Sequence, residues 1–147
     1  LNVIELSTEV CIFLCKYTCW EYYMLNEEKV KQDIEEVRDQ VDVLIVAMHW
    51  GREYTHTPTD LEVKTAKYLA SLDVDIIIGT HPHVIQPLTW IDDTLVIYSL
   101  GNFISNQLSI GLNQGIGLMV GMDIIIDEDG VKFDKENSRF SLCIDIF

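Results

Sequence analysis

Three of the four histidines in this sequence follow short runs of apolar residues. His49 comes directly after residues 43–48, and His81 and His83 come after residues 75–79. Both runs are rich in β-branched residues, which favours strands buried on both faces, as in a parallel sheet. Open α/β sheets bind ligands and metals beyond the carboxyl ends of such strands. The three imidazoles are therefore predicted to lie together and to bind metal.

The spacing of His81 and His83 also suits metal binding. Pro82 between them is expected to hold His81 in an extended conformation. Residues two apart in an extended stretch project from the same side. The two rings could then give two bonds to one metal, or one bond to each of two neighbouring metals. The alternative for a histidine at a strand end is a hydrogen-bonded structural role, but three histidines at adjacent strand ends favour ligation.

The elements that must position these histidines follow from the apolar pattern and the turn residues. The pattern predicts helices over about 27–39 and from 58–60 to about 71, and strands at 43–48, 75–79, 95–99, 117–126, 131–133 and 140–146. A strand, a helix and a strand with short connections form a βαβ unit. The predicted class is therefore α/β, with βαβ units in a parallel sheet followed by antiparallel C-terminal strands.

Two local details accompany these elements. The second helix is expected to bury one stripe of side chains, which comprises Leu61, Thr65, Tyr68, Leu69 and Leu72. Acidic residues are expected to form turns at Asp92–Asp93 and at 127–130, where a hairpin would close. These carboxylates are therefore not predicted to contribute to a metal site.

Length and charge limit the classes of function. The 147 residues suffice for one domain with a hydrophobic core, and 48% apolar with 23% charged residues is the composition of a folded protein. The formal net charge of −14 disfavours binding to nucleic acid or to anionic lipid. No run reaches the roughly 18–20 apolar residues of a membrane span. Divalent cations and basic partners remain compatible with this charge.

The four cysteines do not form a recognisable metal-binding pattern. Cys11, Cys15 and Cys19 are spaced four apart, which on a helix would place them in one stripe, and Cys143 is remote in the sequence. Burial as three small apolar side chains is the favoured interpretation. A disulfide or a metal site remains an alternative, so the sequence does not determine the redox compartment.

Three motifs in order resemble the bacterial capsule-synthesis family CapA, the poly-γ-glutamate biosynthesis branch of the calcineurin-like metallophosphoesterase superfamily. They are His49-Trp50-Gly51-x-Glu53-Tyr54 followed by Pro58, then Gly79-x-His81-Pro82-His83-Val84-x-Gln86, and then Tyr98-Ser99-Leu100-Gly101-Asn102-Phe103. The resemblance covers about residues 27–126, and residues 1–25 match nothing that can be placed. It implies a partial metallophosphoesterase-like α/β/β/α sandwich.

The resemblance also implies roles for individual residues. His49, His81 and His83 match metal ligands of a catalytic two-metal centre that holds manganese, iron or zinc and activates a water. Glu53 and Asn102 lie in the motifs without matching ligand positions. Glu53 is expected either to orient a ligand histidine or to form a salt bridge in its loop, and Asn102 either faces the site or closes a turn. The expected roles are packing for Trp50 and Tyr54 and an exposed loop position for His56.

The sequence departs from the superfamily pattern in its first motifs. No Asp-x-His and no Asn-His dipeptide occurs in it. The chain is therefore expected to be a single domain, 1–147, that corresponds to the C-terminal portion of a CapA-like domain. Three histidines without a bridging carboxylate make at most half of a dinuclear centre, so catalysis by this chain alone is an open question.

Two functions follow from the resemblance. One is a metal-dependent phosphoesterase-like hydrolase that serves synthesis or export of a capsule polymer such as poly-γ-glutamate. The other is a non-catalytic module that binds an anionic polymer through its metal, or an inactive remnant. An anionic polymer or a phosphoester is the expected partner, at the cell surface, with membrane association only through a segment that this sequence does not contain. An unpaired sheet edge also predicts self-association.

Overall fold

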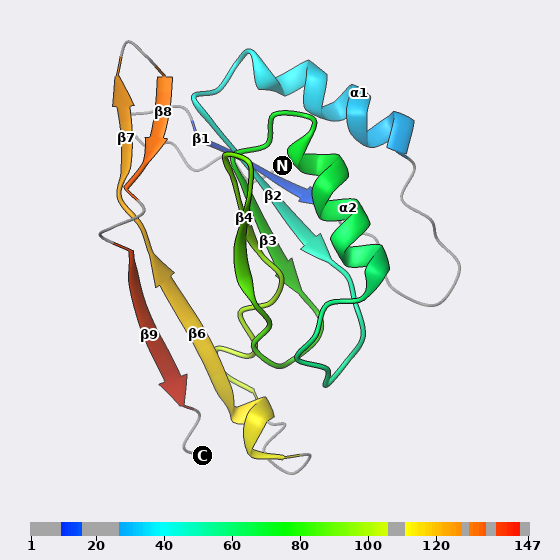
Figure 1. The fold of residues 1–147 in the computed structure, drawn as a ribbon, viewed down its shortest axis with the longest axis vertical. Helices are drawn as coiled ribbons and strands as arrows, with labels where there is room; N and C mark the ends of the chain where they lie inside the picture. The colour runs from blue at the N-terminus through cyan, green and yellow to red at the C-terminus, as the bar shows by residue number, and fades with distance from the viewer. Residues whose placement is uncertain (1–9, 16–26, 106–110, 128–129, 135–137, 145–147) are drawn as a thin grey trace.

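The structure is a computed structural model that describes residues 10–15, 27–105, 111–127, 130–134 and 138–144. Its elements in chain order (Figure 1) are β1 (Val10–Cys15), α1 (Glu27–Arg38), β2 (Val43–His49), α2 (Asp60–Ala70), β3 (Ile76–Thr80), β4 (Leu88–Ile91), β5 (Thr94–Ile97), the short 3-10 helix η1 (Leu112–Gly115), β6 (Ile116–Gly121), β7 (Ile124–Asp127), β8 (Gly130–Phe133) and β9 (Arg139–Ile144). The predicted α/β class is confirmed.

The main sheet has five strands in the order β1-β2-β3-β5-β4. Strands β1, β2, β3 and β5 pair in parallel, and β4 pairs antiparallel with β5. The unit β2-α2-β3 is the βαβ unit that the sequence predicted. Two strands were not predicted, namely β1 and β4. Residues 10–15 form a strand and not the helix that would align the cysteines, and Cys19 lies outside the described residues.

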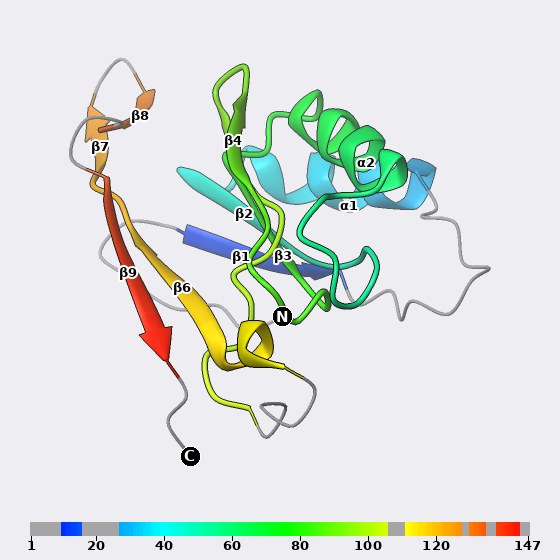
Figure 2. The same cartoon turned by 60° about the horizontal axis from the view of Figure 1, so that its bottom comes forward.

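The apolar side chains of the central strands pack into two hydrophobic cores, one on each face of the sheet. Leu44 and Val46 of β2 pack with Ile77 of β3 against the helices, where the core includes Val30 and Ile34 of α1 and Ala66 and Leu69 of α2. Residues of the same strands that alternate with these face the other way, as Ile45, Ile76 and Ile78 do. Figure 2 shows both helices on one side of the sheet and the ribbons of β6 to β9 on the other. Burial on both faces fixes the positions of the strand ends.

The buried stripe of helix α2 matches the predicted one only in part, since Leu69 is buried and Leu72 packs against the core as expected, whereas Leu61 is not buried. Glu62, Ala66 and Leu69 are buried, whereas Leu61 is 66% exposed. The stripe is displaced because Thr59 caps the helix and Glu62, three residues later, folds back on it in a capping box. This arrangement turns the Glu62 side chain inward and rotates Leu61 to the surface.

The C-terminal strands form two antiparallel ribbons, β6 with β9 and β7 with β8. The single strand predicted over 117–126 is wrong in one respect, because the chain breaks at residues 122–123 and the two halves take different partners. Asp123 stabilises the break, since its carboxylate accepts from Arg139 (3.0 Å) and its carbonyl from the amide of Asp134 (3.0 Å). Within the described ranges, no helix combines the length and the apolar character needed to span a bilayer.

Candidate metal centre

The carboxyl ends of β2 and β3 bring three histidines together. In the parallel register of these strands His49 pairs with Thr80, so that His81 follows at the same edge of the sheet. The amide of Trp50 donates to the carbonyl of Thr80 (3.1 Å), which extends the pairing past the end of β2. The ring centroids of His49 and His81 lie 4.6 Å apart, and those of His81 and His83 lie 6.0 Å apart. The imidazoles thus gather at the edge where the sequence placed them.

The backbone that carries the histidine pair is not extended, contrary to the expectation from Pro82. His81 has φ 99° and His83 has φ 58°, both in the left-handed region. The chain leaves β3 at Thr80 and turns at once, and the turn points both rings to the same side. Such conformations cost about 1–3 kcal/mol each and concentrate at functional sites. Tyr54, with φ 62°, has the same conformation in the facing loop.

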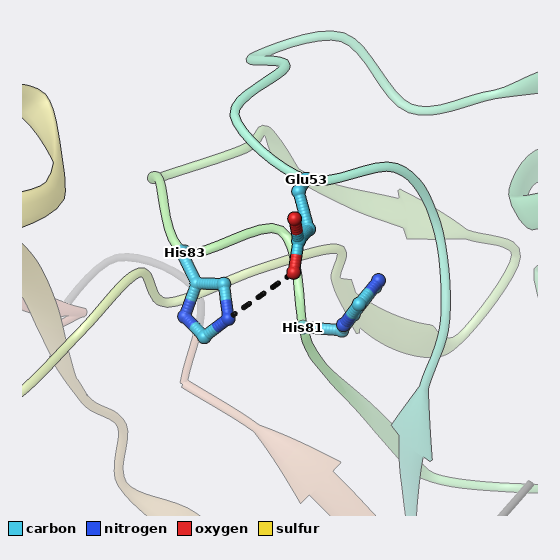
Figure 3. A group of neighbouring side chains, drawn as sticks. All are labelled: Glu53, His81 and His83. Atoms are coloured by element: carbon cyan, nitrogen blue, oxygen red, sulfur yellow. Dashed lines mark ion pairs between the residues drawn. The ribbon is translucent and has the colours of Figure 1, made fainter. Parts of the chain in front are cut away.

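Glu53 reaches the histidine pair from the loop that follows β2. Figure 3 shows its carboxylate between the two rings, on the side of the imidazole nitrogens. The ligand atoms of Glu53, His81 and His83 all lie within 4.8 Å of one another, and Glu53 Oε1 is 4.0 Å from His83 Nε2. A nitrogen and oxygen set of this kind can hold a divalent metal of the zinc, iron or manganese type. Among the described residues, Glu53, His81 and His83 are a group of three side chains whose types and separations suit a metal ion.

Asn102 fixes the orientation and the tautomer of His83. Its Oδ1 lies 2.8 Å from His83 Nδ1, while its Nδ2 donates to the carbonyls of Gln114 (2.8 Å) and His83 (3.5 Å). Because the amide nitrogen is engaged with carbonyls, Oδ1 must accept, and Nδ1 of His83 is the protonated nitrogen. Nε2 is then the nitrogen of His83 that is left for a metal, and it lies 4.0 Å from Glu53 Oε1. Asn102 therefore faces the site, as one of its two expected roles required.

Replacing Asn102 with alanine is expected to weaken metal binding by about 10–100-fold, because the imidazole loses the partner that holds its tautomer. Isothermal titration with Zn²⁺ measures the change. The exposed amide Asn113 of η1 supplies the matched control, and Asn113→Ala should leave the affinity within about threefold. Equal affinities for Asn102→Ala and the unmodified protein would show that the bond to His83 has no part in binding.

His49 stands beside this group and not within it. Its contact with the pair runs through the ring of His81, and it is not one of the three residues whose ligand atoms lie within 4.8 Å of one another. Burial, and then the neighbouring His81 and His83, lower the pKa of His49 below its ordinary value. The ring therefore stays neutral at pH 7, which is the state in which an imidazole binds metal.

The loop that carries Glu53 rests on a buried carboxylate. Gly51 has φ 83°, and a Cβ at this position would overlap the carboxylate of Glu62. Glu62 is only 2% exposed, and its Oε2 accepts from the amide (2.6 Å) and the hydroxyl (2.7 Å) of Thr59. Glu62 was not among the residues predicted from the sequence, although the pattern Thr59-x-x-Glu62 is the signal of a capping box. Glu62 thus supports both the helix start and the loop above it.

Substitution of Gly51 by alanine is expected to lower the free energy of unfolding by about 1–3 kcal/mol, from the positive φ and the overlap with Glu62. Urea denaturation measures this. In the double variant Gly51→Ala/Glu62→Ala the overlap is removed, so the two effects should be non-additive by at least about 0.5 kcal/mol. Additive effects would contradict a direct contact between the two positions.

Further hydrogen bonds tie the two loops to each other. The amide of Tyr54 donates to the carbonyl of Pro82 (2.8 Å), and the buried side chain of Gln86 donates to the carbonyl of Thr55 (2.9 Å). Gln86 was part of a motif in the sequence, but only the structure gives it this linking role. The tip of the Glu53 loop and the His81–His83 turn therefore hold each other in place.

The remaining motif residues take supporting positions. Trp50 is buried, stacks on Tyr98 and donates from Nε1 to the Tyr98 carbonyl (2.9 Å), which is the packing role expected of it. Tyr54 is 38% exposed and stacks on the His83 ring. His56 is exposed, as expected, but its nitrogens contact the Ile85 carbonyl (2.8 Å) and the Asn113 amide (3.3 Å). His56 therefore links loops and does not join the other histidines.

Comparison with known proteins gives consistent matches. The protein named "PGA biosynthesis protein CapA" from Bacillus subtilis (strain 168) is 39% identical over 74 residues, which are 50% of this chain and 20% of that protein. "Capsule biosynthesis protein CapA" of Bacillus anthracis is 33% identical over 87 residues, 56% of this chain and 21% of that protein. The chain thus spans about a fifth of the length of these curated relatives.

A solved structure supports the fold. A Staphylococcus aureus protein assigned provisionally as a 5′-nucleotidase, crystallised in complex with alpha-ketoglutarate, matches with a TM-score of 0.50 at 21% identity, over 86% of this chain and 23% of that protein. At this identity the likeness concerns the fold alone. The family described as bacterial capsule synthesis protein PGA_cap matches residues 8–107, a range that contains His49, Glu53, both histidines of the pair and Asn102. Since this match covers more than half of the sequence, the chain belongs to the bacterial capsule synthesis protein family PGA_cap.

Proposed function

We propose that this chain carries the histidine half of a metallophosphoesterase-type metal site in a CapA-like protein of capsule or poly-γ-glutamate synthesis at the cell surface. The observation that carries the proposal is the convergence of His49, His81 and His83 at the carboxyl ends of β2 and β3. Membership of the capsule synthesis family supports the biological setting. The activity of the whole protein is part of the proposal, since the chain spans about a fifth of its curated relatives.

The residues present fit the metal that the fold family implies. Asn102 engages Nδ1 of His83 and so directs Nε2 toward the site, and burial together with the neighbouring histidines lowers the pKa of His49. His49 and Glu53 are exposed, whereas His81 and His83 are half-buried, so a metal and a substrate can reach the site. Bound manganese, iron or zinc supplies Lewis acidity toward a phosphoester oxygen and lowers the pKa of a water ligand. The chain's own contribution is to hold three imidazoles in one group, with the ring of His83 oriented by Asn102.

A second candidate is a module that binds an anionic polymer through its metal without turnover. The net charge of −14 favours it, because a protein this acidic repels a polyanion unless a cation bridges the two. Polymer carboxylates are oxygen ligands that could complete the coordination of a metal held by histidines. The two candidates share the metal site and differ in whether a bond of the substrate is broken.

The test uses the purified chain loaded with Mn²⁺ or Zn²⁺, with bis-p-nitrophenyl phosphate as a generic phosphodiester and poly-γ-glutamate as the polymer. Metal-dependent turnover that disappears in His81→Ala supports the hydrolase. Polymer binding that EDTA abolishes, without turnover, supports the binding module. A chain that retains no metal in equilibrium dialysis overturns both candidates.

A further inference from the structure

We propose that strand β9 is the surface through which two copies of this chain associate, edge to edge and antiparallel, about a two-fold axis. The proposal is independent of the metal site and of the proposed function. Strand β9 pairs with β6 on one side, and among the described residues no strand pairs with its other edge. Figures 1 and 2 both show β9 along an outer side of the molecule, with β6 between it and the main sheet.

The backbone of β9 presents hydrogen-bonding groups at this free edge. The amide of Leu118 in β6 donates to the carbonyl of Leu100 (2.7 Å), on the side of β6 that faces away from β9. Leu118 lies opposite Leu142, so these two residues form a non-hydrogen-bonded pair of the antiparallel ladder. The N–H and C=O groups of Leu142, and those of Phe140 two residues earlier, therefore point to the free edge. An antiparallel strand of a second copy can bond to them without any rearrangement of β6 and β9.

The side chains of the same two residues form an exposed apolar face. Phe140 is 57% exposed and Leu142 is 64% exposed. They lie opposite Val120 and Leu118 of β6, so all four project from one face of the ribbon, and Val120 packs against the core of the main sheet. With Ser141 at the two-fold axis, Phe140 of each copy lies directly opposite Leu142 of the other. Cross-strand pairs of this kind stabilise sheets, and here they would extend an existing core.

The charges of the ribbon favour a second copy over other partners. Neither β6 nor β9 contains an acidic residue, although the chain has a net charge of −14. Arg139 is the basic residue of the two strands, and it pairs with Asp123 (3.0 Å). The edge therefore offers no carboxylate to a basic partner, while the charge of the whole chain repels nucleic acid and anionic lipid. Two copies can meet here without placing acidic residues of their strands against each other.

The sequence of β9 also lacks the features that keep sheet edges apart. Residues 140–144 contain no charged residue and no proline, which are the usual means of preventing edge-to-edge pairing. The surface is nevertheless small, because a stable interface buries about 800 Å² on each partner and two exposed side chains on one strand edge do not reach this. We therefore expect a reversible dimer with a Kd between about 1 µM and about 200 µM.

Sedimentation velocity between about 5 µM and about 500 µM chain measures this equilibrium. The buffer contains EDTA and a phosphine reductant, so that neither a bridging metal nor a disulfide can join two chains. Leu142→Lys should raise the Kd at least about tenfold, because it places a lysine from each copy in the apolar face of the joined sheet. Met119→Lys is the matched control, since Met119 is 48% exposed on the opposite face of the same ribbon. It should change the Kd by less than about threefold.

Leu142→Pro separates strand pairing from a merely apolar contact. The amide that proline lacks points to the free edge, so the ladder with β6 keeps its hydrogen bonds while the second copy loses a donor in each strand. We expect the Kd to rise at least about tenfold although the side chain remains apolar. Circular dichroism verifies that each variant is folded. In the unmodified chain, the amides of Phe140 and Leu142 should exchange with solvent more slowly at the highest concentration than at the lowest.

Each result supports or overturns the proposal. A monomer throughout the concentration range overturns it and leaves the edge of β9 to a different partner. A dimer that persists in both variants of Leu142 also overturns it and places the contact elsewhere, such as at the free edge of β1. A dimer lost in Leu142→Lys but retained in Leu142→Pro contradicts the antiparallel pairing. If Leu142→Pro does not fold, exchange rates at Phe140 and Leu142 that do not depend on concentration contradict it instead.

Discussion

Alanine at position 79 is expected to lower the free energy of unfolding by about 3 kcal/mol or more, a large fraction of the roughly 5–15 kcal/mol that is typical of a domain. A Cβ at Gly79 would overlap the carbonyl oxygen of Tyr98 and the indole nitrogen of Trp50. These two groups are hydrogen-bonded to each other (2.9 Å), so the methyl group would also break a buried bond. Overpacking alone costs about 1–3 kcal/mol, and an unsatisfied buried partner adds about 1–3 kcal/mol. Urea denaturation followed by far-ultraviolet circular dichroism measures the change.

Gly121 of β6 offers a matched control for this substitution. A Cβ there would meet no heavy atom closer than 3.7 Å, an ordinary van der Waals contact. Gly121→Ala should therefore be neutral or slightly stabilising, because alanine reduces the entropy of the unfolded chain. If both alanine variants unfolded at the same urea concentration, the close approach of β3 to residue 98 would be wrong.

Metal should stabilise the folded chain, and His81→Ala/His83→Ala should abolish that stabilisation. A ligand at about 100 times its dissociation constant raises the free energy of unfolding by about 2.7 kcal/mol when it binds only the folded state. The double variant lacks two of the three clustered imidazoles, so its melting temperature should be the same with Zn²⁺ and with EDTA. Differential scanning calorimetry in the two conditions gives the increment directly.

His56→Ala is the control for this second prediction. It removes one imidazole from the chain but none from the cluster of His49, His81 and His83. It also leaves in place the cysteines that an unfolded chain could use to bind zinc. Its melting temperature should fall slightly, because two loop contacts are lost. Its metal-dependent increment should nevertheless equal that of the unmodified protein. A smaller increment would mean that zinc binds nonspecifically to histidine.

The sequence predicted the elements with the strongest patterns. The apolar runs of β2 and β3 and the capped start of α2 were found close to their observed bounds, and the parallel arrangement then placed His49 beside His81. The short strand β4 was missed because only one of its four residues, Thr89, is polar, which is too little to show the alternation of a strand. Its pairing with β5 depends on tertiary contacts. The break after β6 was missed because Asp123 is the only charged residue in the otherwise apolar range 117–126, and its partners Arg139 and Asp134 lie in later segments.

The candidate site was predicted in its residues and only partly in its geometry. The histidine trio and Asn102 follow from motifs and strand ends. The left-handed turn at His81 did not follow, because a proline after it favours extended backbone in the absence of tertiary contacts. The placement of Glu53 between the rings depends on how its loop is anchored to Glu62 and Pro82, which no local pattern reports.

The buried carboxylate of Glu62 couples two parts of the chain that would otherwise move separately. One oxygen bonds to the first turn of α2, and the carboxylate fills the space below Gly51. Opening the Glu53 loop would therefore expose the Glu62 side chain and at the same time fray the start of α2. The loop and the helix start should therefore open as one cooperative unit. Amide protons of the helix's first turn and of the loop would then exchange with solvent at a shared rate. The position of the Glu53 carboxylate beside His81 and His83 is thus set by the stability of a helix end that lies outside the candidate site.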